Sequence, residues 1–311
     1  MATDAVAIGR KSAGMARRGR HTGLTQWLEA LPFLLPTIIG FFVFISGPVV
    51  AAFILGFTKW DLLTPPKWVG LGNYSDMFTK MPLFWKTMGN TFYYTILFIV
   101  PGVVLPLLVA VFMNQKARAI SIYRSVFFLP VITSTVAVAL VWFWLYNPEF
   151  GLINYFLDMV GIKGPLWLAH PKTAMPSIVI MSIWKGLGYT MVIYLAGLQG
   201  VPQELYEAAA IDGAGRWGRH RYVTLPLLTP TIFFVVVTTV MGSLQVFEQT
   251  YMLTGGGPAY STTTLSWYIY VQAFQWMHMG FSCALAYVLF FIILVLTLIQ
   301  FRLQRVWVFY G

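Results

Sequence analysis

The chain has 311 residues, of which 58% are hydrophobic and only 10% are charged. Because soluble domains carry about 25% charged residues, this composition excludes an ordinary soluble protein and indicates an integral membrane protein. The net charge of +10 would suit a nucleic acid partner, but the basic residues cluster beside long apolar runs, which is typical of membrane topology. We therefore expect a membrane, and no nucleic acid, around this chain.

Catalytic and metal-binding motifs are missing from the sequence. It contains no GxxxxGKS or GxxxxGKT phosphate loop, no HExxH pair and no CxxC pair. The one cysteine, Cys283, lies in an apolar run and cannot form an internal disulfide, so we interpret it as a packing residue. We expect a non-catalytic chain without metal or cofactor, whose energy source is another chain or a gradient.

The N-terminal residues 1–26 are rich in arginine, lysine and small residues, and we expect a disordered basic arm in the cytoplasm. The apolar run that follows, at residues 31–57, is too long for the core of a signal peptide and has no convincing cleavage site. It predicts the first transmembrane helix.

The apolar runs predict an all-α membrane protein with six transmembrane helices, at residues 31–57, 91–113, 125–146, 175–198, 227–253 and 280–301. Pro101 and Pro106 are expected to kink the second helix, and Pro130 lies near the start of the third. Three longer segments, 58–90, 147–174 and 254–279, would lie outside the cell. Every arginine falls in the arm, in segments 114–124 or 201–226, or near the C-terminus. The positive-inside rule therefore places both termini in the cytoplasm, with a permease domain at 27–305 and a tail at 306–311.

A polar, helix-prone segment separates the fourth and fifth predicted helices at residues 201–226. Pro202 suits a first helical position, acidic residues in the opening turns favour the positive end of the helix dipole, and Asp212-Gly213 breaks the helix. A second short helix with several arginines follows. Such a narrow helix suits the groove of another protein, although an ordinary amphipathic loop is the alternative. The candidate docking residues are Glu204, Glu207, Ala208, Ala209, Asp212, Gly213 and Ala214.

The series Glu207-Ala208-Ala209, Asp212-Gly213-Ala214 and Leu225-Pro226 resembles the EAA loop of ABC-importer permeases. In that family the loop is a coupling helix that sits in a cleft of a cytoplasmic ATPase. The resemblance implies a type I ABC importer permease fold in a bacterial or archaeal plasma membrane. It also implies a second permease subunit, two ATPase subunits that bind Mg-ATP, and an extracytoplasmic solute-binding protein.

A glycine-rich turn, Gly255-Gly256-Gly257-Pro258, follows the fifth predicted helix. It is either a plain exit turn or a loop that brings backbone close to a partner. Together with the threonines and tyrosines after it, the block resembles the carbohydrate-uptake, maltose-permease-like group of these permeases, and the resemblance extends over residues 30–305. It implies a carbohydrate substrate and a loop that faces the binding protein.

Lys185 lies near the middle of the fourth predicted helix, where a charge costs about 2.5–3.5 kcal/mol. It should face a cavity or a partner, with snorkelling as the alternative, and Glu248 on the next helix is a possible partner. Gly186 thins the helix beside it.

In the maltose-permease-like group, residues from three helices contact the substrate. The resemblance carries these roles to Val131, Thr135, Lys185, Gly186, Tyr189, Thr239, Gly242, Ser243 and Val246, and Gln245 and Glu248 add nearby polar groups. Lys185, Gly242 and Val246 depart from the group's residue types, which indicates a different sugar. The sequence thus predicts one permease subunit of an ATP-driven importer. The alternatives are a gradient-driven secondary transporter, which would carry inverted repeats and paired intramembrane acids, and a non-transporting assembly subunit.

Overall fold

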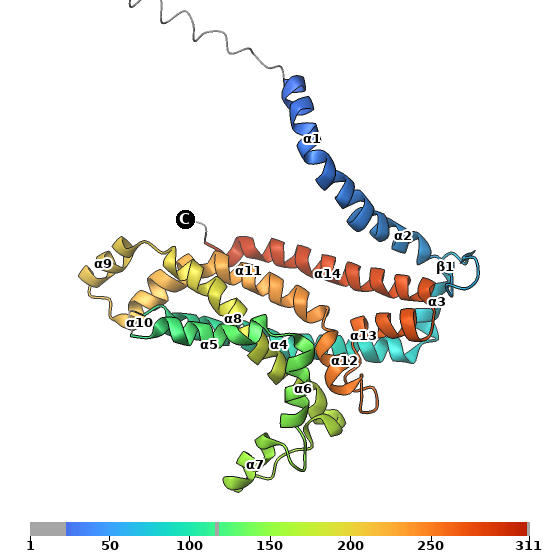
Figure 1. Cartoon of the computed structure of the whole chain (residues 1–311). Coiled ribbons are helices and arrows are strands. Elements are labelled where there is room, and N and C mark those ends of the chain that lie inside the picture. Colours follow the sequence, from blue (N-terminus) through green and yellow to red (C-terminus); the bar gives the residue numbers. More distant parts are fainter. Residues whose placement is uncertain (1–22, 116–117, 310–311) are drawn as a thin grey trace, which may run out of the picture. The chain divides into compact units, whose positions relative to one another are not determined.

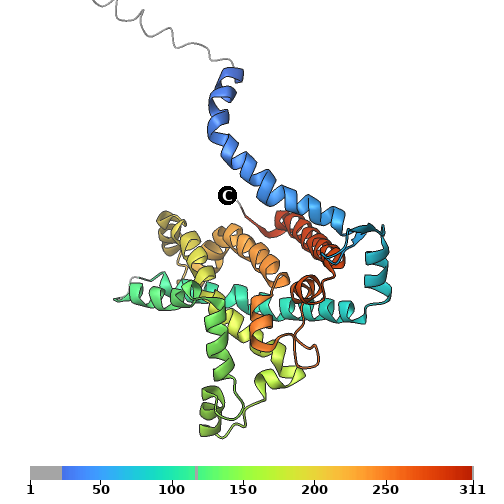
Figure 2. The same ribbon diagram turned by 45° about the vertical axis from the view of Figure 1, so that its right-hand side comes forward.

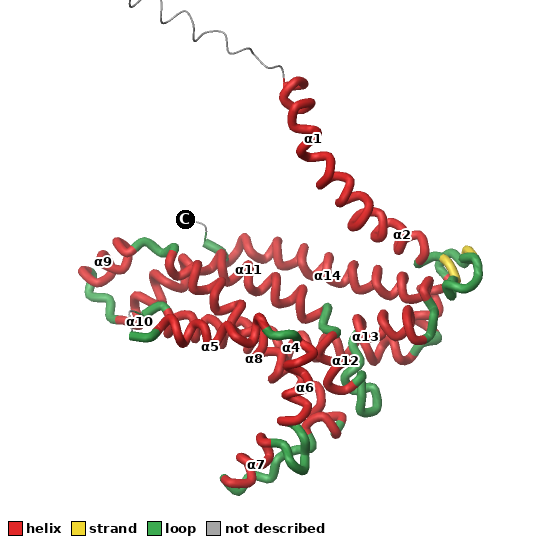
Figure 3. Tube along the Cα trace, in the orientation of Figure 1, coloured by secondary structure: helices red, strands yellow, loops and turns green. Residues whose placement is uncertain are grey.

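The computed structural model describes residues 23–115 and 118–309, and most of these residues are helical (Figures 1 and 3). Five helices are long and apolar enough to cross a membrane, and a sixth candidate span consists of two helices joined at a sharp bend. The prediction of an all-α membrane protein with six spans is confirmed. Within the described residues, the strands are limited to one two-stranded hairpin, β1 (Thr58–Lys59) with β2 (Lys67–Trp68).

By its internal contacts the chain divides into two units, Met1–Ala52 and Phe53–Gly311. In the first unit, α1 (Gly23–Phe41) continues through a π-helical turn into α2 (Gly47–Leu55), whose last three residues belong to the second unit. Its apolar side chains are exposed around the helix, as expected of a helix that lies in lipid or against another membrane chain. The predicted arm is wrong for residues 23–26, which form the first turn of α1; residues 1–22 lie outside the described part.

The second unit contains the remaining spans and the segments that join them. Its helices are α3 (Gly72–Thr79), α4 (Pro82–Met113), α5 (Ile120–Ile132), α6 (Thr135–Leu145), α7 (Leu152–Met159), α8 (Pro171–Gln199), α9 (Gln203–Ile211), α10 (Arg216–Arg219), α11 (Leu225–Leu244), α12 (Glu248–Thr254), α13 (Leu265–Tyr270) and α14 (Met279–Trp307). In Figure 1, α9 and α10 lie at one end of the long helices, the α9 end, and α3 and α13 lie at the other, the α13 end.

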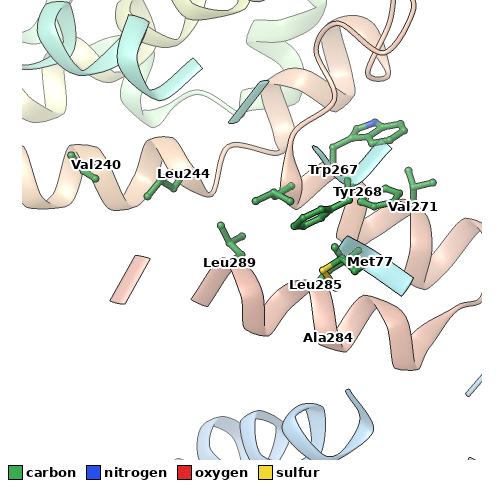
Figure 4. Packing of buried hydrophobic residues seen from close by; sticks show 11 residues of the cluster. Met77, Val240, Leu244, Trp267, Tyr268, Val271, Ala284, Leu285 and Leu289 are labelled. Atoms are coloured by element: carbon green, nitrogen blue, oxygen red, sulfur yellow. The ribbon is translucent and has the colours of Figure 1, made fainter. Parts of the chain in front are cut away.

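The long helices of this unit pack in pairs: α4 contacts α8 and α11, α5 contacts α8, and α11 contacts α14. Buried apolar side chains fill the space between them, and at the α13 end they join α3, α4, α13 and α14 (Figure 4). Members of that cluster include Met77, Phe84, Leu244, Leu265, Tyr268 and Leu285. Figures 1 and 2 both show α6 and α7 projecting away from the long helices.

Several predicted helix ends are wrong by up to three turns, because hydropathy does not register amphipathic end turns. The helix α4 begins at Pro82, a favourable first helical position, so residues 82–90 are helical rather than part of an outer segment. Pro101 and Pro106 lie inside this uninterrupted helix. At the C-terminus, α14 continues to Trp307, so the predicted tail of residues 306–311 begins inside the helix.

The third predicted span is not one continuous helix. It consists of α5 and α6, which meet at an angle of 99°. Pro130 has no amide hydrogen for the helical bond pattern, and three residues later the backbone of Thr133 is extended, with ψ 144°. The Thr133 hydroxyl donates to the carbonyl of Pro130 at 2.7 Å, which pairs one acceptor left by the end of α5.

The fifth predicted helix is also broken. The helix α11 ends at Leu244, and α12 begins at Glu248. At its other end α11 continues without interruption from α10, so the second short helix predicted after Gly213 is part of this span. A π-helical turn at His220–Thr224 precedes Pro226, where the ring of proline would clash with the regular bond pattern of an α-helix.

The close approach of α5 to α8 yields a stability prediction. A Cβ atom at Gly188 would overlap the backbone of Phe127, whereas a Cβ at Gly186 has open space around it. We expect Gly188→Ala to lower the free energy of unfolding by about 1–3 kcal/mol, because the backbone of α5 must shift. Thermal unfolding of the purified protein in detergent measures this effect. Gly186→Ala is the matched control, and equal melting temperatures for the two variants would contradict the predicted packing.

Candidate functional site

A cavity of about 530 Å³ opens in the second unit beside the breaks in the third and fifth spans. Its wall is formed by α4, by the residues around the α5–α6 break, by α8, and by the end of α11 with the start of α12. All the residues predicted for the substrate path lie in this wall. They are Val131, Thr135, Lys185, Gly186, Tyr189, Thr239, Gly242, Ser243, Gln245, Val246 and Glu248. The structure therefore brings these separated residues together around one space.

One wall of this cavity was not predicted from the sequence. Tyr94 and Phe98 of α4 line it, with their rings stacked at 5.6 Å between centroids. Their spacing of four residues places them on one face of a helix, which is the signal that could have indicated them. Other lining residues that were not predicted are Ser182, Thr190, Thr238, Phe247 and Gln249.

Lys185 lies midway between the ends of α8, and its side chain is half-buried in the cavity wall. Its Nζ donates to the carbonyl oxygen of Thr133 at 3.2 Å. That carbonyl belongs to the end of α5, where the helix dipole favours a positive charge. Within the described residues no ion pair joins Lys185 to Glu248, so the suggested pairing with Glu248 is wrong: the break after α5 supplies a nearer acceptor.

Some of the other polar groups of the cavity make hydrogen bonds within the protein. The Ser243 hydroxyl donates to the carbonyl of Val240 at 2.9 Å, and the Gln245 amide donates to the carbonyl of Met241 at 3.0 Å. Glu248 is exposed at the start of α12. Aromatic faces combined with separate donors and acceptors suit a polyhydroxylated ligand. In the described part of the chain no group of His, Cys, Asp and Glu side chains could hold a metal ion.

The predicted glycine turn lies at the α13 end, and side chains of α4 donate hydrogen bonds to the loop that contains it. Gly255 and Gly256 have φ of +58° and +91°, and a Cβ at Gly256 would lie 2.8 Å from the ring of Trp267. The Asn90 amide donates to the carbonyls of Tyr260 and Thr263, at 2.9 Å each, and Lys86 Nζ donates to the carbonyl of Ala259 at 2.6 Å. We call residues 255–264 the outer loop; α4 braces it through side chains.

The predicted docking helix is α9, at the opposite end of the long helices (Figure 1). It begins at Gln203, one residue after Pro202, and carries Glu204, Glu207, Ala208 and Ala209. Asp212 follows the helix, Gly213 has φ of +82°, and the amide of Ala214 donates to the carbonyl of Ala209 at 2.9 Å. The carboxylate-bearing side chains of this segment, Glu204, Glu207 and Asp212, are exposed and accessible to a partner.

A contact that the sequence did not indicate fixes α9 to the fifth span. The hydroxyls of Tyr206 and Thr224 lie 3.0 Å apart, close enough for one to donate to the other. Beside this bond, Leu205 and Ala208 of α9 line a smaller cavity of about 410 Å³ together with Pro226 and Phe309. The helix α9 is therefore connected by this hydrogen bond to the π-helical turn His220–Thr224 of the fifth span.

A cavity lined by both polar and apolar side chains lies beside two broken membrane spans, and an exposed acidic helix lies at one end of the long helices; this arrangement is typical of a polytopic permease of a membrane transport system. Residues 102–307 match the family model described as "Binding-protein-dependent transport system inner membrane component". The chain belongs to this family, and it is a permease subunit of an ABC importer.

Individual relatives agree with this assignment. The chain is 38% identical to the probable ABC transporter permease protein YesP of Bacillus subtilis, over 91% of this chain and 92% of that protein. It is 33% identical to the arabinooligosaccharides transport system permease protein AraP of Bacillus subtilis, over 89% of each. A solved bacterial ABC transporter that imports the acidic polysaccharide alginate matches with a TM-score of 0.81 and 27% identity, covering 91% of this chain and 96% of that one. The predicted importer permease with a type I fold is confirmed.

The bracing of the outer loop can be tested directly. Asn90→Ala removes the donor to two loop carbonyls, one exposed and one partly buried, and a typical hydrogen bond contributes about 0.5–1.5 kcal/mol. We expect faster amide hydrogen exchange in residues 255–264, with unchanged exchange in α9. Tyr93→Ala, on the exposed face of the same helix, serves as the control. Unchanged exchange in the outer loop of Asn90→Ala would show that the loop is held by other contacts.

Proposed function

We propose that this subunit forms part of the path by which a saccharide crosses the membrane after delivery by an extracytoplasmic binding protein. The observation that carries the proposal is the cavity in which the predicted substrate-path residues meet. Stacked aromatic rings would face the apolar faces of a sugar, and the amide, hydroxyl and charged groups would bond its hydroxyls. AraP, named for arabinooligosaccharides, and the alginate importer support this class of substrate.

The proposed assembly contains a second permease subunit and two ATPases that bind Mg-ATP, in the plasma membrane of a bacterium or archaeon. A solved alginate importer was crystallised together with a periplasmic protein that carries an alginate pentasaccharide, which supports the binding protein as a partner. In this proposal α9 lies in a cleft of an ATPase through Glu204, Glu207, Ala208, Ala209, Asp212, Gly213 and Ala214, and Gly255, Gly256, Gly257 and Pro258 face the binding protein. This chain supplies no catalytic group for ATP hydrolysis.

The proposal is tested with the complete importer reconstituted in proteoliposomes. Wild-type complex should take up a labelled saccharide only when ATP and the loaded binding protein are both present. Glu207→Lys reverses an exposed charge on α9 without touching the core, so the subunit should assemble but couple poorly. We expect stimulated ATP hydrolysis and uptake to fall at least tenfold, which corresponds to about 1.4 kcal/mol.

Asp158→Lys is the matched control, because it reverses an exposed charge on α7, away from α9. Full stimulated hydrolysis and uptake in Glu207→Lys would remove Glu207 from the proposed ATPase contact. The absence of any binding-protein-dependent uptake in wild-type complex, across a panel of saccharides, would refute the substrate class.

The proposed orientation places both termini and α9 in the cytoplasm and the outer loop outside. In a Cys283→Ala background, single cysteines at Ile211 on α9 and at Leu63 in the hairpin replace side chains that are 87% and 89% exposed. We expect a membrane-impermeant maleimide to label Leu63→Cys in intact cells and Ile211→Cys only after permeabilisation. Labelling of both cysteines in intact cells would contradict the orientation.

A further inference from the structure

Lys185 carries a positive charge for which the cavity provides only partial compensation. Its ammonium group has three donors, and the structure assigns one of them to the carbonyl of Thr133. No carboxylate of the described chain lies within ion-pairing distance of it. The group lies midway along a membrane-spanning helix and lines the cavity, so its remaining donors are directed at whatever occupies that space or at its solvent.

The one other charged side chain in the cavity wall is Glu248, at the start of α12. A carboxylate accepts hydrogen bonds and an ammonium group donates them, so the two groups offer opposite functions to a ligand. Tyr189, Gln245 and Gln249 line the same space and provide neutral polar groups. The cavity therefore has one cationic donor site and one anionic acceptor site that do not neutralise each other by direct contact.

We propose that the transported saccharide is acidic, and that Lys185 binds its anionic group, in the simplest case the carboxylate of a uronic acid. This inference rests on the proposed function. A neutral saccharide that filled the cavity would surround the ammonium group with hydroxyls alone, and burying a charge without a counter-charge is unfavourable. A carboxylate supplies the counter-charge and a charge-assisted hydrogen bond, which is shorter and stronger than a neutral one.

Glu248 sets the orientation of such a ligand. It repels a carboxylate and accepts from sugar hydroxyls, so the acidic group is directed to Lys185 and the hydroxyls to Glu248. The bond from Lys185 to Thr133 is retained in this arrangement, because the ammonium group has donors for both. Lys185 is thus a specificity-determining residue that also occupies the acceptor at the end of α5.

The test uses matched probes: short oligogalacturonides and their carboxyl-reduced counterparts, in which a hydroxymethyl group replaces each carboxylate. Uptake of both is measured in proteoliposomes that contain the complete importer, at saturating binding protein. We expect wild-type complex to favour the acidic probe at least tenfold, and Lys185→Met to lower that ratio at least tenfold. Lys185→Arg, which keeps the charge, should retain most of the preference. Lys172→Met, in the first turn of the same helix and outside the cavity, is the matched control and should leave the ratio unchanged.

The outcomes separate this inference from the proposed function. Uptake of the neutral probe with an unchanged ratio in Lys185→Met would overturn the acidic substrate and leave the saccharide importer standing. An equal loss of both probes in Lys185→Met, together with a lower yield of complex, would show that the residue only closes the end of α5, and would also overturn the inference. If neither probe is taken up by the wild-type complex while another saccharide without an acidic group is, the substrate class proposed here is wrong.

Discussion

Every backbone carbonyl inside a membrane needs a partner in the protein or in a water-filled cavity, because hydrocarbon offers none. This chain breaks two of its spans, and each break leaves a carbonyl that a side chain from a distant segment occupies. Lys185 of α8 donates to the carbonyl of Thr133 at the first break, and Thr264 donates to the carbonyl of Val246 at the second, at 2.8 Å. Each of these two carbonyls is paired with a charged or hydroxyl side chain that lies within the membrane-spanning unit. Such a side chain is itself costly in hydrocarbon, so these breaks are stable only beside a cavity or a buried polar network.

The two breaks meet these conditions in different ways. The first has a lysine whose remaining donors reach the cavity, whereas the second has a fully buried threonine that belongs to the outer loop. The next residue, Leu265, donates its amide to the hydroxyl of Thr91 in α4 at 2.9 Å. The outer loop, the cavity wall and α4 are therefore joined by short hydrogen bonds in a buried region. If these bonds stay intact, a displacement of the outer loop also moves the wall of the cavity.

Sequence patterns predicted the spans and the short helix α9 but not the breaks. Residues 125–146 are mostly apolar apart from Ser125 and Thr133-Ser134-Thr135, and a straight helix of the same composition would have the same hydropathy. Pro130 is a local contribution to the bend, but the partner of the Thr133 carbonyl is Lys185, which lies 52 residues away and outside any local window. Conversely, the helix at Glu207-Ala208-Ala209 and the turn at Gly213 were recognisable because their signals are local. Tyr94 and Phe98 were missed because aromatic residues in membrane helices are commonly interfacial or lipid-facing, and only the fold shows that this face of α4 turns inward.

One continuous helical segment connects the neighbourhood of α9 with the cavity. Residues Arg216–Leu244 form a single helical span, with a π-helical turn where Pro226 would otherwise interrupt it. Near its first turns Thr224 meets Tyr206 of α9, and its last turn carries Gly242 and Ser243 into the cavity wall. A helix is stiff along its axis, so a tilt imposed at one end displaces the other. The break after Leu244 is held by the hydrogen bond from Thr264 to the carbonyl of Val246, so a displacement of the cavity wall also acts on the outer loop. The interruption that forms part of the cavity wall therefore connects the fifth span to that loop.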